Sequence, residues 1–111
     1  MTTQAQPGIS QQNDVEATIK RISGHPGVQG LLVLMDDGTV IRSTFDDEMT
    51  SKYSKLVSTY TILSRSSIRD IDPANELNYV RIRSDKRELV CIPEGKYFII
   101  VVTSMDAEFK P

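Results

Sequence analysis

The first apolar pattern in the chain is short and amphipathic. Val15, Ile19 and Ile22 recur at helical spacing and place one apolar stripe along Asp14–Ser23. The His25–Gly27 sequence, HPG, prevents the helix from continuing. The pattern therefore predicts a helix of about three turns.

Five later segments carry the alternating or continuous apolar patterns that are typical of β-strands. They are Val28–Met35, Thr39–Thr44, Leu77–Ser84, Arg87–Ile92 and Tyr97–Ser104. Asp37–Gly38 is a strong tight-turn signal, which joins the first two segments into a hairpin. The last segment is almost continuously apolar, so we expect it at the centre of a sheet with both faces covered.

A long helix is predicted between the second and third strands, because Glu48–Ile71 contains no Gly or Pro and has an apolar stripe. The stripe comprises Met49, Tyr53, Leu56, Val57, Tyr60, Leu63, Ser64, Ser67, Ile68 and Ile71. The opposite side carries Lys52, Lys55, Ser58, Ile62, Arg65 and Arg69. Such a helix spans about 35 Å. We expect one part of the broad stripe to cover a sheet and another part to meet a second copy.

The order of elements is helix, two strands, long helix, three strands. This order indicates an α+β sandwich, with a mostly antiparallel five-stranded sheet and a helix on each face. The domain is expected over residues 13–104. Residues 1–12 have no charged side chain and are predicted to form a flexible tail, and residues 105–111 a C-terminal tail.

Composition narrows the classes of function. The chain has 111 residues, enough for one domain, and a formal net charge of −2. That charge argues against general binding of nucleic acid or anionic membranes, which both favour a basic excess. One cysteine cannot form an internal disulfide, so a cytoplasmic location is expected. The longest apolar run, Tyr97–Val102, is too short to insert across a bilayer.

The most suggestive polar motif is the pair Asp70 and Asp72, followed by Pro73. A metal site would need further ligands, and no second acidic cluster or Gly-rich loop accompanies the pair. We therefore expect a structural role, either at the exit of the long helix or in pairing with Arg69 or Arg81.

No other residues form a catalytic constellation. His25 is the only histidine and lies in a Pro-Gly turn, and Cys91 has no basic partner and is expected to be a buried or half-buried apolar residue. The serines of Ser64–Ser67 lack a G-x-S-x-G setting. No enzyme activity, metal or cofactor is expected.

Tyr79, Arg81 and Arg83 are predicted to share one strand face, with Val80 and Ile82 on the other. An aromatic residue beside two arginines could stack on single-stranded nucleic acid. A solvated strand face is favoured instead because of the acidic net charge, and a border of a protein–protein contact is a third reading.

The segments IKRISGHPGVQGLLVLMDDGTVIRSTFD and SRSSIRDIDPANELNYVRIRSDKRELVCIPEGKYFIIVV resemble the roadblock-type light chains of dynein. The resemblance covers Asp14–Val102, and RDIDP…ELNYVRIRSDK is its most specific part. It implies a non-enzymatic protein of the roadblock/longin fold that forms a homodimer, with a joined ten-stranded sheet and paired long helices. It also implies that the protein binds the dynein intermediate chain and contacts microtubules only through the motor. The implied location is the cytoplasm, in association with the cytoskeleton, with an axoneme or cilium as the possible site. Related modules are scaffolds or regulators of small GTPases, which is the alternative function.

The resemblance and the predicted faces together give two sets of site residues. Candidates for the dimer interface are Leu56, Tyr60, Leu63, Asn78, Val80 and Ile82. Candidates for binding a partner helix, in a trough beside the short helix, are Val15, Ile19, Tyr79, Arg81 and Arg83.

Overall fold

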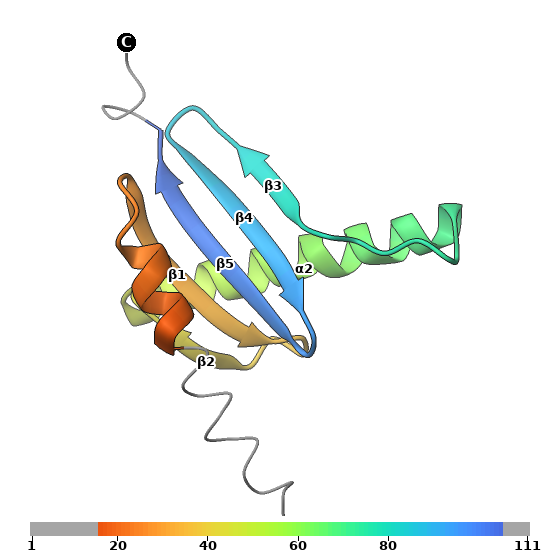
Figure 1. The fold of residues 1–111 in the computed structure, drawn as a ribbon, viewed down its shortest axis with the longest axis horizontal. Helices are drawn as coiled ribbons and strands as arrows, with labels where there is room; N and C mark the ends of the chain where they lie inside the picture. Colours follow the sequence, from red (N-terminus) through yellow and green to blue (C-terminus); the bar gives the residue numbers. More distant parts are fainter. Residues whose placement is uncertain (1–15, 106–111) are drawn as a thin grey trace, which may run out of the picture.

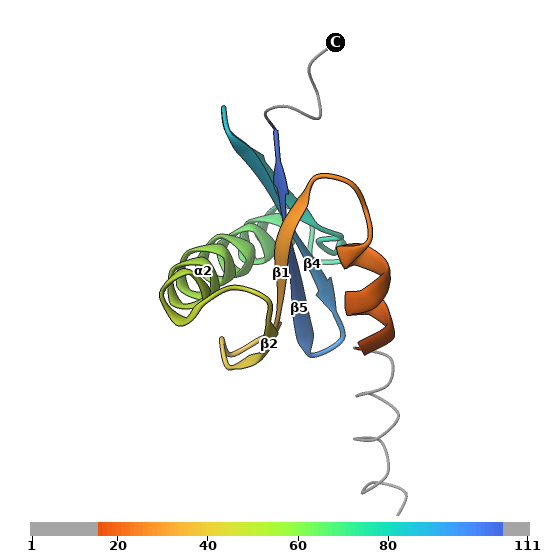
Figure 2. The same cartoon turned by 90° about the vertical axis from the view of Figure 1, so that its left-hand side faces the viewer.

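The computed structural model describes residues 16–105, which form one sheet with a helix on each face (Figures 1 and 2). The strands are β1 (Val28–Met35), β2 (Val40–Ser43), β3 (Val80–Arg83), β4 (Arg87–Glu94) and β5 (Tyr97–Ser104). The long helix α2 (Asp47–Ile71) lies along one face. Residues 16–23 are helical and lie on the other face, over β1. The predicted α+β fold is confirmed.

The five strands are arranged in the order β2-β1-β5-β4-β3. Every pairing between neighbours is antiparallel, and β5 lies in the centre as expected. The hairpin turns use glycine where the backbone requires a positive φ, at Gly38 and Gly95. The carboxylate of Asp37 accepts the Thr39 backbone N–H at 2.9 Å, and this bond lowers the pKa of Asp37.

The edge strand β3 is shorter than the sequence predicts. It was expected over Leu77–Ser84, but ladder pairing with β4 runs only from Val80 to Arg83. The preceding residues lead the chain back from the end of α2, which extends past the sheet edge (Figure 1). A strand needs a neighbour to pair with, so β3 begins only where the chain reaches β4.

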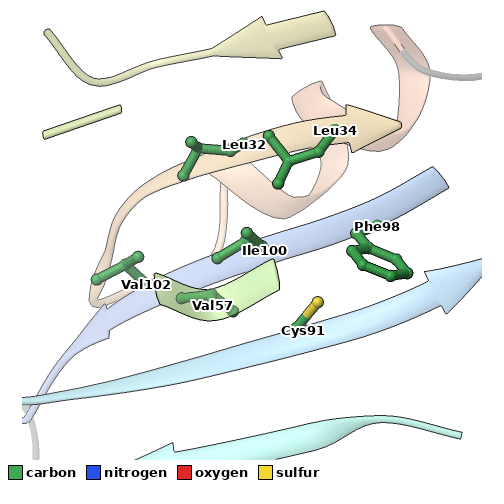
Figure 3. Close-up of a cluster of buried hydrophobic side chains, with 7 residues drawn as sticks. All are labelled: Leu32, Leu34, Val57, Cys91, Phe98, Ile100 and Val102. Carbon is green, nitrogen blue, oxygen red and sulfur yellow. The ribbon is translucent and has the colours of Figure 1, made fainter. Parts of the chain in front are cut away.

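The main core lies between the sheet and α2 (Figure 3). It comprises Leu32, Leu34, Val57, Cys91, Phe98, Ile100 and Val102, with Phe45, Tyr53 and Leu89 packed around them. A smaller cluster lies beneath the N-terminal helix. There Ile19 packs with Leu31 and Val33, and Ile22 and Tyr97 border the group.

The expectation that both faces of β5 are covered is met in full only on the α2 side. Side chains alternate along the strand, and those facing α2, such as Phe98 and Ile100, are fully buried. Ile99 and Val101, on the other face, are only half-buried. The helix of residues 16–23 covers β1 and one end of β5, and no described element lies over β4 on that side (Figure 1).

The predicted division of α2 into an apolar and a polar side is also wrong. Ser54, Ser58 and Thr61 face the sheet and are buried. The Ser58 hydroxyl donates to the Ser54 carbonyl and the Thr61 hydroxyl to the Val57 carbonyl, so burial leaves neither hydroxyl unpaired. Small side chains allow the helix to approach the sheet closely.

Arg65 was expected on the solvated side of α2, but its guanidinium lies 5.3 Å from the centre of the Phe98 ring. A long arginine side chain can cover apolar surface in this way, and the ring face attracts its charge. Leu56, Tyr60 and Leu63, which belong to the part of the stripe that was expected to meet a second copy, are exposed.

Candidate protein-binding surfaces

The Asp70–Asp72 motif forms the exit of α2. The Asp72 backbone N–H donates to the Ile68 carbonyl, and its carboxylate accepts the Ala74 N–H at 3.1 Å. The backbone at Asp72 is extended, as expected before proline. Arg69 and Arg81 were considered as partners of this motif, but their charges face Glu76 and Glu88. The structural role at the helix exit is confirmed.

Cys91 is a core residue, with 1 % of its surface exposed. Burial raises the pKa of its thiol, against smaller opposing effects from the Thr61 hydrogen bond and the Arg65 charge. A buried, protonated thiol is a poor nucleophile. Within residues 16–105 no three or more His, Cys, Asp or Glu side chains are grouped closely enough to hold a metal ion.

An open groove of about 570 Å³ runs between the second half of α2 and the edge strand β3. Its lining includes Tyr60, Leu63, Ile68, Leu77, Tyr79, Val80 and Ile82. Four of the six predicted dimer-interface residues, Tyr60, Leu63, Val80 and Ile82, therefore come together in one place. Leu77 was not predicted as an interface residue: the sequence placed it at the start of the third strand, whereas it lies outside β3 and lines the groove.

Two lining residues, Tyr60 and Leu63, form an exposed apolar stripe along α2 together with Leu56. Their spacing of four and three residues places them on one helix face, and they are 58 %, 49 % and 62 % exposed. Asn78 is also exposed and precedes β3. We name Leu56, Tyr60, Leu63, Val80 and Ile82 the α2–β3 surface.

The free edge of the sheet lies beside this surface. β3 pairs with β4 alone, so its other side presents backbone groups with no strand neighbour among the described residues. Unpaired strand edges next to apolar side chains are a template for pairing with another chain. The backbone edge and the exposed apolar stripe are thus positioned to be covered together.

A second surface lies on the opposite face of the sheet. Arg81 and Arg83 both contact the carboxylate of Glu88 on β4, at 3.5 and 3.6 Å, which confirms that they share a face. Tyr79 does not belong with them by strand alternation, because it precedes β3 and lines the groove on the α2 side. The structure therefore divides the three residues that were predicted to act together.

The two remaining partner-binding candidates belong to the N-terminal helix. Ile19 is 8 % exposed and packs on Leu31 and Val33, so it offers a partner little surface. Val15 lies outside the described residues. The Glu16 carboxylate forms an ion pair with Arg42 of β2, which ties the helix to the sheet at the edge far from β3.

This combination of a five-stranded antiparallel sheet and one long helix along a face agrees with the sequence comparison. Residues 14–104 match the Roadblock/LC7 domain family. The chain belongs to this family. As a roadblock domain it has the fold that the sequence resemblance implied, and none of its described helices is long and apolar enough to cross a membrane.

Solved structures of other roadblock proteins share the fold at low sequence identity. A Roadblock/LC7 domain from Streptomyces avermitilis superposes with a TM-score of 0.70 at 17 % identity, over 77 % of this chain and 72 % of that one. MglB from Myxococcus xanthus superposes with a TM-score of 0.67 at 14 % identity, over 82 % of this chain and 76 % of that one. At these identities the likeness concerns the fold.

Proposed function

We propose that this roadblock domain is a non-catalytic accessory light chain of a dynein motor. In this role it forms a homodimer, binds the dynein intermediate chain, and supports motor assembly and cargo attachment in microtubule-based transport. The observation that carries the protein-binding role is the α2–β3 surface, where large apolar side chains lie exposed beside an unpaired strand edge.

The self-association part of the proposal follows from that surface. Monomeric proteins rarely leave a continuous row of large apolar residues next to a free β edge. Pairing of β3 with β3 of a second copy would satisfy the backbone, and the same symmetry would bring the exposed stripes of the two α2 helices together. The shortness of β3 is compatible with this arrangement because the pairing is reinforced by the helices.

The dynein assignment is supported by the resemblance of RDIDP…ELNYVRIRSDK to the roadblock light chains of that motor. The fold alone does not show which protein complex the chain belongs to, since roadblock proteins from two bacteria share it. A scaffold or regulator of a small GTPase is therefore the second candidate function.

One binding experiment separates the two functions. The purified full chain is titrated calorimetrically with the light-chain-binding segment of a dynein intermediate chain and, separately, with a small GTPase loaded with GTP or GDP. Saturable binding of the intermediate-chain segment alone supports the light-chain function. Binding that is confined to the nucleotide-loaded GTPase supports the alternative and contradicts the dynein assignment.

The dimer is tested by sedimentation equilibrium at micromolar concentration. The expected mass is twice the chain mass of 12.4 kDa. Tyr60→Glu and Leu63→Glu should each shift the equilibrium toward monomer, because a charge would be buried without a partner. Lys55→Glu, at an exposed position about 100° around α2 from Leu56, is the matched control. A folded wild-type monomer at high concentration would contradict the proposal.

A further inference from the structure

Arg87 begins β4 and faces the side of the sheet on which α2 lies. It alternates along the strand with Leu89 and Cys91, which pack in the core between the sheet and α2. The Nε atom of Arg87 is buried, yet it has no hydrogen-bond partner among residues 16–105. None of the ion pairs within those residues includes Arg87. A buried guanidinium nitrogen without a partner is costly, so Arg87 calls for a group that residues 16–105 of one copy do not supply.

The C-terminal end of α2 also carries groups that the described residues leave without partners. Asp70 is exposed, and it takes no part in the ion pairs of the described residues, since Arg69 in the same turn faces Glu76. Ile71 is 82 % exposed, the highest value among the large apolar side chains of the described residues. The last carbonyl groups of a helix carry partial negative charge as well. This end of α2 therefore offers a negative charge and an apolar side chain to another surface.

The path of the chain indicates which surface that is. Figure 1 shows that α2 extends past the edge of the sheet and that the chain then returns to the start of β3. Antiparallel pairing of two β3 strands about a two-fold axis would place the start of one strand beside the end of the other. The end of β3 leads through the turn at Ser84–Arg87 into β4. The end of α2 from one copy would therefore lie on the α2 side of the second copy's sheet, beside Arg87 of that copy.

We propose that Arg87 of each copy binds the C-terminal end of α2 in a second copy, with the Asp70 carboxylate as its ionic partner. The contact occurs twice in a two-fold dimer, and the apolar side chain of Ile71 is covered beside it. The inference rests on the proposed homodimer and goes beyond it, because these two charges select the chain that pairs with this one. A roadblock chain with a cation in place of Asp70, or a carboxylate in place of Arg87, is rejected by like-charge repulsion.

The test is sedimentation equilibrium of full-length charge-reversal variants, alone and mixed. Arg87→Glu places a carboxylate opposite Asp70 in both contacts and should raise the dissociation constant of the dimer about tenfold or more. Asp70→Lys places a cation opposite Arg87 and should have the same effect. In an equimolar mixture of the two variants, the introduced carboxylate faces the introduced ammonium group in one contact, and the other contact keeps the native pair. The mixture should therefore form a heterodimer at concentrations where each variant alone is mainly monomeric.

Lys96→Glu and Asp36→Lys make the same changes of charge in exposed turns at the opposite end of β4, and they should change the dissociation constant less than twofold. Circular dichroism melting establishes that each variant is folded, and the exposed position of Asp70 keeps the test decisive if Arg87→Glu unfolds.

The outcomes separate the contact from the dimer. A monomeric wild type contradicts the proposed homodimer itself. A dimeric wild type whose dissociation constant is unchanged by the reversals overturns the contact between Arg87 and Asp70 while the homodimer stands. Reversals that weaken the dimer without rescue on mixing also overturn the contact, because the two residues then do not face each other.

Discussion

The two faces of β5 differ in how completely the protein itself covers them. Phe98, Ile100 and Val102 point toward α2 and are fully buried, whereas Ile99 and Val101 point the other way and are half-buried. The side chains on the two faces are chemically alike. Their different burial therefore arises from what packs over each face among the described residues: a helix of 25 residues on one side and the helix of residues 16–23 on the other.

This difference distinguishes a closed side of β5 from a partly open one. Over β5, the α2 face is a closed core in which Phe98, Ile100 and Val102 are fully buried. On the opposite face Ile99 and Val101 keep part of their surface exposed among the described residues, and covering that surface would contribute roughly 25 cal/mol per Å². The predictions below test whether the two faces differ in energy as they differ in burial.

The largest expected difference is between Ile100→Ala and Ile99→Ala. Removal of the fully buried Ile100 side chain should lower the free energy of unfolding by about 2–5 kcal/mol, because it leaves a cavity. Removal of the half-buried Ile99 side chain should cost about 1–2 kcal/mol, since part of its surface is already in water. Urea unfolding at one protein concentration measures both. Equal losses would contradict the view that the second face is incomplete.

Gly30 tests how tightly the α2 face is packed. A Cβ atom at Gly30 would lie 2.6 Å from the Phe45 ring and 2.7 Å from the Thr44 hydroxyl. Gly30→Ala should therefore lower stability by about 1–3 kcal/mol, because the aromatic ring must move. Gly24→Ala is the control, since its Cβ would meet only backbone oxygens at ordinary contact distances. An unchanged melting temperature for Gly30→Ala would show that this face can relax.

Asp46 tests the helix that covers the closed face. Its carboxylate accepts the Met49 backbone N–H at 2.8 Å and caps the first turn of α2. Asp46→Ala should lower the free energy of unfolding by about 1 kcal/mol, while Asp47→Ala, which removes only a charge from the first turn, should cost about 0.5 kcal/mol. Thermal unfolding distinguishes the two. A larger loss in Asp47→Ala would show that capping at Asp46 is not the main contribution.

The sequence predicted the elements well because their signals are local. Each signal depends only on neighbouring residues: the apolar pattern of Val28–Met35, the Asp-Gly turn, and the absence of Gly and Pro from Glu48 to Ile71. Accordingly β1, β5 and the end of α2 lie where they were expected. β3 was predicted too long because its bounds depend on where β4 lies beside it. That is a tertiary property.

The candidate surfaces were predicted less well, for a related reason. Helical periodicity grouped Leu56 with Val57, although one is exposed and the other buried, because hydrophobicity does not reveal which part of a broad stripe meets the sheet. Ser58 was placed on the polar side because a hydroxyl counts as polar, yet Ser58 and Thr61 bond to their own helix, and small residues of this kind suit close packing. The half-burial of Val101 depends on the length of the opposing helix and could not be read from β5 itself.

The smallest expected effect concerns Cys91, on the closed face. Burial raises the pKa of its thiol above the value of about 8.5 for an unperturbed cysteine, so the folded state favours the protonated form. Relative to Cys91→Ala, this contribution to stability is fully present below pH 8.5. It falls as pH rises through the folded-state pKa, by no more than about 1.4 kcal/mol per pH unit. Urea unfolding of both proteins from pH 7 to pH 10 should show the stability difference narrowing at the alkaline end.

The comparison with Cys91→Ala removes the titration of lysines and tyrosines, which the two proteins share. A difference that stays constant over this range would mean that the thiol ionises as easily in the folded chain as in the unfolded one, and that the α2 face is less closed around Cys91 than its burial indicates.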